Sequence, residues 1–103
     1  MLMATIAVTK SNIEEKILTS QKVILLEFWA EWCAPCRDMY TVLDEVASRR
    51  PDILIGKVNV DYEPDLARTY GIVSRPTLVI IKEGKIAKKI SGYQSEEDIL
   101  EWL

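Results

Sequence analysis

Histidine is absent from this chain of 103 residues. Its absence excludes nucleophilic catalysis by a Cys–His pair and every metal site that needs an imidazole ligand. Cysteine is nearly absent as well, since the chain has only Cys33 and Cys36. Two thiolates cannot complete the tetrahedral coordination of a zinc ion within one chain. Redox chemistry is therefore the use that remains for this C-x-x-C pair.

The chain also lacks a surplus of positive charge. It has 13 Lys and Arg residues against 16 Asp and Glu residues, a net charge of −3. Phosphate recognition requires a basic face, so we expect neither a nucleic acid nor a membrane among the partners. The basic stretch at residues 82–89 is interrupted by Glu83, Ile86 and Ala87. This favours a solvated hairpin over a binding patch.

Long hydrophobic runs are missing too. No segment approaches the roughly 20 apolar residues that span a bilayer, and residues 1–8 contain no basic segment of the kind that opens a signal peptide. We therefore expect a cytoplasmic protein without a membrane anchor. In a reducing compartment a structural disulfide is not expected, which also favours a redox use of the cysteine pair. The length suits a single domain over residues 1–103, and we expect a monomer.

Hydrophobic patterning predicts alternating strands and helices. Nearly continuous apolar runs indicate buried parallel strands, and Glu83-Gly84 indicates a tight turn between two antiparallel strands. The predicted strands are residues 5–8, 23–30, 53–60, 77–82 and 85–91. Helices are predicted after Ser11, from the cysteine pair to Arg49, over residues 64–70 and from Ser95 to the end. Ser11 with Glu14, and Ser95 with Asp98, have the spacing of helix N-terminal caps. The predicted order is β-α-β-α-β-α-β-β-α, an α/β protein.

The position of the cysteine pair is more informative than its spacing. A bare C-x-x-C is compatible with redox chemistry, metal binding or chance, but here the pair follows a buried strand and begins a helix. Backbone N–H groups at a helix N-terminus favour the thiolate form of Cys33, which is the attacking species. Residues three apart in a first helical turn can close a disulfide, and Pro35 fits there. We expect Cys33 to be the exposed nucleophile and Cys36 the buried resolving thiol.

A resemblance to the thioredoxin family supports this interpretation. The run FWAEWCAPCR at residues 28–37 resembles the family's active-site stretch, and KVNVD at 57–61 and SRPT at 74–77 resemble its central strand and proline loop. Gly84 and Gly92 also fall where the family has glycines. The resemblance implies a thioredoxin fold, a mixed sheet of four to five strands flanked by four helices. It also implies reduction of disulfides in client proteins, no bound cofactor, and recycling by a thioredoxin reductase that uses FAD and NADPH.

Glu27 is a single carboxylate within an otherwise apolar strand. An unpaired buried charge is unfavourable, so Glu27 should be protonated, paired or near water. It is either a surface-facing residue or the proton acceptor and donor for Cys36, at a position where the family usually has Asp. Lys57 is either its partner, as the resemblance suggests, or a lysine that extends to the sheet edge.

The proline loop and the surroundings of the dithiol supply the candidate client-binding residues. In the family the peptide bond before Pro76 is cis and lies against the dithiol, and such a loop can bind an extended client strand. Arg75, before that proline, replaces an apolar residue and is either close to Cys33 or a solvated side chain. Trp29 is either a packing residue or a direct participant. We expect an exposed apolar docking rim of Trp32, Ala34, Pro35, Val60, Val73 and Gly92.

Three alternatives can be compared at this stage. The chain is a disulfide reductase, a disulfide isomerase or oxidant of the same fold, or a thioredoxin-like binding subunit without activity. Isomerases and oxidants often have histidine between the cysteines, which this chain lacks. A pure scaffold needs neither the dithiol nor Glu27. Ala34, Thr41 and Arg75 differ from the family's commonest residues and are expected to affect reduction potential and client range, without changing the reaction class.

Overall fold

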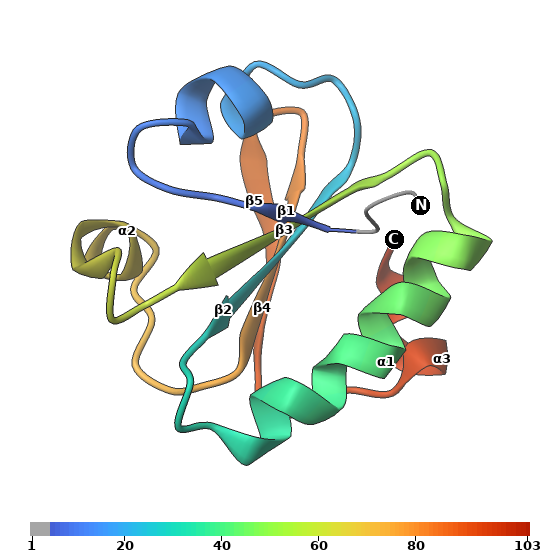
Figure 1. Cartoon of the computed structure of the whole chain (residues 1–103). Helices are drawn as coiled ribbons and strands as arrows, with labels where there is room; N and C mark the ends of the chain where they lie inside the picture. Colours follow the sequence, from blue (N-terminus) through green and yellow to red (C-terminus); the bar gives the residue numbers. More distant parts are fainter. Residues whose placement is uncertain (1–4) are drawn as a thin grey trace.

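The computed structural model describes residues 5–103 and contains a five-stranded sheet with helical segments on both faces (Figure 1). The strands are β1 (Ile6–Ala7), β2 (Ile24–Trp29), β3 (Leu54–Asn59), β4 (Thr77–Lys82) and β5 (Lys85–Ser91). The helical segments are η1 (Glu14–Leu18), α1 (Ala34–Arg49), α2 (Pro64–Thr69) and α3 (Glu96–Trp102). The predicted order of elements is confirmed, while the first four residues of the predicted domain lie outside the described part.

The sheet has the order β1-β3-β2-β4-β5, with β2 at its centre. Strand β2 runs parallel to β3 and antiparallel to β4, so the sheet is mixed as expected. The residues of β2 from Ile24 to Phe28 are all buried, which explains why this segment is almost continuously apolar. The strand ends at Trp29, close to where α1 begins, and so delivers the chain to the cysteine pair.

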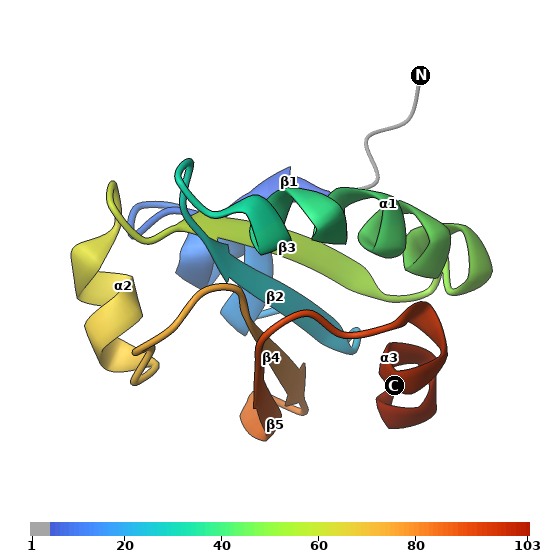
Figure 2. The same cartoon turned by 90° about the horizontal axis from the view of Figure 1, so that it is seen from below.

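Two hydrophobic clusters lie on opposite faces of the sheet. Leu26 and Phe28 of β2 belong to the cluster with Ile17 of η1 and Leu66 of α2. Leu25 belongs to the other cluster, which includes residues of α1 and α3. Figure 1 and Figure 2 show this division, with α1 and α3 on one face and η1 and α2 on the other. By strand alternation, Glu27 faces α1.

Two local predictions are confirmed at the C-terminal hairpin and helix. Glu83 and Gly84 both have positive φ, 53° and 77°, as a two-residue hairpin turn of matching twist requires. The Ser95 hydroxyl accepts a hydrogen bond from the Asp98 N–H at 3.1 Å and caps α3. Strand β5 is almost entirely exposed, in agreement with a solvated hairpin.

The capping box predicted at Ser11 and Glu14 is wrong. The first helical segment has no side-chain cap, and it is a single π-helical turn in which the Thr19 N–H donates to the Glu14 carbonyl at 3.2 Å. The Asn12 side chain instead accepts from the Thr9 N–H at 2.8 Å. The polar side chain of Asn12, which precedes the helical segment, therefore stabilises the turn before it and does not cap the helix. Within residues 5–103 no helix is long and apolar enough to cross a membrane.

Candidate active site

Cys33 and Cys36 form a disulfide at the N-terminus of α1, with their Cα atoms 5.2 Å apart. Cys33 is the N-cap residue, and its sulfur accepts a hydrogen bond from the Cys36 N–H at 3.1 Å. Pro35 lies in the first helical turn, where no intrahelical N–H bond is lost. The predicted placement of the pair, between a buried strand and a helix start, is confirmed.

The two sulfur-bearing residues differ in exposure. Cys36 is completely buried, whereas Cys33 is partly exposed. Cys33 lines a surface hollow of about 520 Å³ together with Trp32, Pro35 and Arg75. A second protein can therefore reach Cys33 from outside but cannot reach Cys36 without passing it.

Glu27 is completely buried on the α1 side of the sheet, opposite Lys57 of β3 and Leu78 of β4. Its Oε1 lies 3.8 Å from the Lys57 ammonium, and within residues 5–103 neither of its carboxylate oxygens has a hydrogen-bond partner. Burial raises the pKa of Glu27 from 4.5 to about 7, and the positive charge of Lys57 opposes that rise. The surface-facing alternative for Glu27 is excluded, and Lys57 is its partner.

Lys57 lies between aromatic rings. Its ammonium is 3.3 Å from the ring centroid of Tyr40 on α1 and 5.3 Å from that of Trp29 on β2. Burial lowers the pKa of Lys57, while the carboxylates of Glu27 and Asp44 raise it. Tyr40 is not among the residues predicted from the sequence. Its position four residues after Cys36 places both side chains on one face of α1, but gives no indication of its contact with Lys57.

The Arg75-Pro76 peptide bond is cis, as the resemblance implied. Pro76 is buried, and its carbonyl accepts a hydrogen bond from the Gly92 N–H at 2.7 Å. Arg75 lines the same hollow as Cys33. Arg75 is therefore exposed to solvent and also borders the hollow of Cys33, so each of the two alternatives is correct in part.

The expected docking rim is exposed at most of its positions. Trp32 and Val73 are 88% and 94% exposed, Ala34 and Pro35 are exposed, and Gly92 is half-buried. The prediction is wrong for Val60, which is only 7% exposed. Its N–H donates to the Trp29 carbonyl at 2.9 Å, which extends the pairing of β3 with β2 by one residue. Its side chain consequently lies on the same face as that of Val58 and joins the core.

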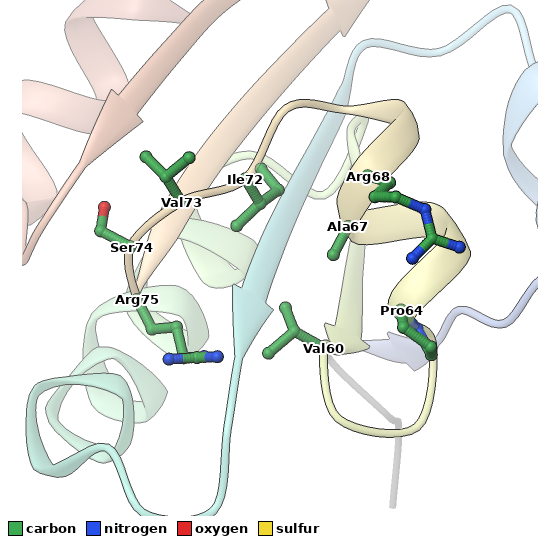
Figure 3. A pocket seen from close by; sticks show the side chains of 8 residues that line it. All are labelled: Val60, Pro64, Ala67, Arg68, Ile72, Val73, Ser74 and Arg75. Atoms are coloured by element: carbon green, nitrogen blue, oxygen red, sulfur yellow. The ribbon is translucent and has the colours of Figure 1, made fainter.

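A smaller hollow of about 160 Å³ adjoins this region, between α2 and the segment that precedes Pro76. Figure 3 shows Ile72, Val73 and Arg75 on one side of it, and Ala67 and Arg68 of α2 on the other. Arg75 lines both hollows, so this residue borders the hollow at the disulfide as well as the second depression.

Comparison with known proteins decides the family. The family model described as Thioredoxin matches residues 4–103. This chain belongs to the thioredoxin family. A thioredoxin of Mycobacterium bovis is 40% identical over 101 residues, which cover 97% of this chain and 87% of the relative. A thioredoxin of Alicyclobacillus acidocaldarius is 40% identical over 97 residues, or 93% and 91% of the two chains.

Membership of the thioredoxin family, together with the Cys33–Cys36 disulfide, makes the chain a thiol–disulfide oxidoreductase and a protein-disulfide reductase. Its substrates are client proteins that contain disulfides. Thioredoxins normally have no bound cofactor. In the part of the chain that the structure describes, no group of three or more His, Cys, Asp or Glu side chains is arranged to hold a metal ion.

Proposed function

We propose that Cys33 is the nucleophile of the reductase reaction and Cys36 the resolving thiol. The observation that carries this assignment is their difference in exposure, since Cys33 opens onto a surface hollow and Cys36 is buried behind it. The Cys33 thiolate attacks one sulfur of a client disulfide, which forms a mixed disulfide and releases one client thiolate. The Cys36 thiolate then attacks the Cys33 sulfur. The second client thiolate leaves, and the Cys33–Cys36 disulfide stores the oxidising equivalents.

Glu27 is the group that accepts the proton of the Cys36 thiol before this second attack. Its pKa of about 7 suits proton exchange near neutral pH. Its burial on the α1 side of the sheet also keeps it away from competing bulk water. Lys57 supplies the positive charge that stabilises the carboxylate once it has lost its proton. Lys57 also lines two surface hollows of about 240 and 370 Å³, which supports a route from the pair to solvent.

Clients dock against the exposed surface around Cys33. Trp32, Ala34, Pro35 and Val73 provide exposed apolar area, and Gly92 continues it near Pro76. Pro76 shapes the backbone beside which an extended client segment can lie. Arg75 adds positive charge between the two hollows.

A thioredoxin reductase that uses FAD and NADPH recycles the oxidised protein. A bifunctional thioredoxin reductase/thioredoxin of Mycobacterium leprae supports this partner. That protein is 37% identical to this chain over 97 residues, which cover 93% of this chain and 21% of its own length. We further propose that the chain acts as a single-domain monomer in the cytoplasm.

Insulin reduction coupled to NADPH oxidation tests the proposed function. With a bacterial thioredoxin reductase, NADPH and insulin, the protein should cause loss of NADPH absorbance and precipitation of the insulin B chain. Both signals should disappear when Cys33 is replaced by serine. Reactivation of scrambled ribonuclease without NADPH oxidation would instead indicate the isomerase alternative.

Arg75 is expected to favour clients with acidic residues beside their disulfide. Its side chain is exposed next to Cys33, and within residues 5–103 it forms no ion pair with an acidic side chain. Replacing Arg75 with isoleucine should reduce the preference for an acidic over a basic peptide disulfide by about two- to fivefold at low salt. Initial reduction rates of two such peptides, measured at low and high salt, provide the test.

The control for Arg75 is Lys85→Ile, which removes one positive charge at the far end of the β4–β5 hairpin. It should leave the preference unchanged. If Arg75→Ile and Lys85→Ile reduce the preference equally, the effect belongs to net charge and not to the position of Arg75. High salt should abolish any preference that Arg75 creates.

A further inference from the structure

The aromatic ring of Tyr40 lies very close to the ammonium of Lys57 in the active site. Its ring centroid lies 3.3 Å from the Lys57 ammonium, closer than the nearest Glu27 oxygen at 3.8 Å. Tyr40 follows Cys36 by one helical turn, so α1 carries the resolving cysteine and the ring that meets the Lys57 ammonium on the same face. The Trp29 ring lies 5.3 Å from the same ammonium.

The Tyr40 ring matters for the position of the Lys57 ammonium because few other contacts fix it there. Among the described residues its ammonium donates no hydrogen bond to a side chain or backbone group, and its distance to Glu27 exceeds hydrogen-bond length. Its side chain is 17% exposed. A long flexible amine with one partly open side would gain hydration by turning outward. The negative face of the Tyr40 ring opposes that movement by electrostatic attraction.

We propose that Tyr40 is a positioning residue, which holds the Lys57 ammonium beside Glu27 while Glu27 exchanges a proton with Cys36. The inference rests on the proton-transfer role proposed for Glu27. It assigns to Tyr40 a role that acts through Lys57. The tyrosine hydroxyl has no part in it, because only the ring face meets the ammonium.

Other charged groups also face Lys57, and they determine where its ammonium moves when the Tyr40 ring is removed. Glu27 approaches from β2 and Asp44 from α1, and both favour the charged lysine. Glu31 and Glu63 line the hollow on another side of Lys57, next to Trp29. Without the ring, the exposed Asp44 and Glu31, the half-buried Glu63 and the solvent compete for the ammonium. Glu27 then loses part of the positive charge that stabilises its carboxylate.

Titration of Glu27 in the oxidised protein tests this inference, because the two cysteines do not titrate while they form a disulfide. The carboxyl carbon of Glu27 is followed by NMR against pH in the parent and in three variants. Tyr40→Leu should raise the pKa of Glu27 by about half a unit or more above the parent value. Tyr40→Phe, which keeps the ring face, should retain the parent value. Tyr93→Leu, at another exposed tyrosine, should also retain it.

The outcomes separate this inference from the function on which it rests. An unchanged or lowered pKa of Glu27 in Tyr40→Leu would overturn the positioning role, and so would an equal rise in Tyr40→Phe. The second measurement is the pH profile of mixed-disulfide resolution, which should move upward in Tyr40→Leu by the same amount as the pKa of Glu27. If Glu27→Gln leaves that profile unchanged, the proton-transfer role itself fails, whatever the NMR titration gives.

Discussion

Cys36→Ser is expected to stop the reaction at the mixed disulfide between Cys33 and the client. Cys36 lies three residues from Cys33 and is already in disulfide distance, so its attack is intramolecular. A thiol from solution cannot match the effective concentration of a positioned neighbour. Turnover in the insulin assay should fall by at least about a thousandfold, and covalent complexes with insulin should accumulate. Non-reducing electrophoresis after acid quenching detects them.

Cys33→Ser provides the matched comparison. It should lose turnover to the same extent but form no covalent complex, because Cys36 is completely buried and cannot reach a client. Alkylation of the reduced parent protein under native conditions should label Cys33 first. Faster labelling of Cys36, or mixed disulfides formed through Cys36, would show that the two roles have been assigned the wrong way round.

Glu27→Gln is expected to slow the resolution step by at least about tenfold near neutral pH, because the Cys36 thiol loses its proton acceptor. Glutamine preserves the shape of the side chain and cannot ionise. Stopped-flow mixing of the reduced protein with a chromogenic aromatic disulfide separates the two steps. The first coloured thiolate appears at a rate that depends on concentration, and the second at a rate that does not. Only the second rate should fall.

The same substitution should change how stability depends on pH. The pKa of Glu27 is about 7 in the folded protein against 4.5 for an ordinary glutamate, so between these values the folded state binds more protons than the unfolded state. Its contribution to the free energy of unfolding is therefore complete below pH 4.5 and is lost as the pH rises through about 7. The loss amounts to roughly 3 kcal/mol. Glu27→Gln should remove this decline.

Urea unfolding of the oxidised protein at about pH 4.5 and about pH 8 measures the effect. The free energy of unfolding of Glu27→Gln, measured relative to that of the parent, should be higher at about pH 8 than at about pH 4.5. Glu45→Gln, at an exposed carboxylate of α1, should follow the parent at both values. If the difference in stability between the parent and Glu27→Gln were the same at both pH values, Glu27 would hold no proton to exchange over this interval.

The order of elements could be predicted because the chain marks its boundaries locally. Glu83-Gly84 has the residues that a two-residue turn with positive φ requires, and Ser95 caps the helix that follows it. The capping box at Ser11 failed for a complementary reason. A polar side chain near a helix start can bond to the turn before it as readily as to the helix, and here the Ser11 hydroxyl lies 3.0 Å from the Thr9 hydroxyl.

The residues of the candidate site could be predicted where a side chain is chemically unusual for its segment. They could not be predicted where their role depends on contacts with distant parts of the chain. Glu27 was identifiable because a carboxylate within an apolar strand needs an explanation, and Lys57 because it lies in the neighbouring strand. Val60 was misplaced because an apolar residue at a strand end can face either way, and only the continued pairing to Trp29 decides its direction. Tyr40 could not be recognised, because its partner is 17 positions away in the chain, on β3, and nothing local connects them.

The arrangement of the sheet has a consequence for behaviour at high concentration. An open sheet ends in unpaired backbone groups, which can recruit the edge of another molecule and start aggregation. Here one edge is β1, only two residues long, and the other is β5, which carries Lys85, Lys88 and Lys89 and is interrupted by a bulge in its pairing with β4. Pairing the β5 strands of two molecules would place lysines near lysines across a distorted ladder. We therefore expect the folded chain to remain dispersed where a flat, uncharged edge would form fibres.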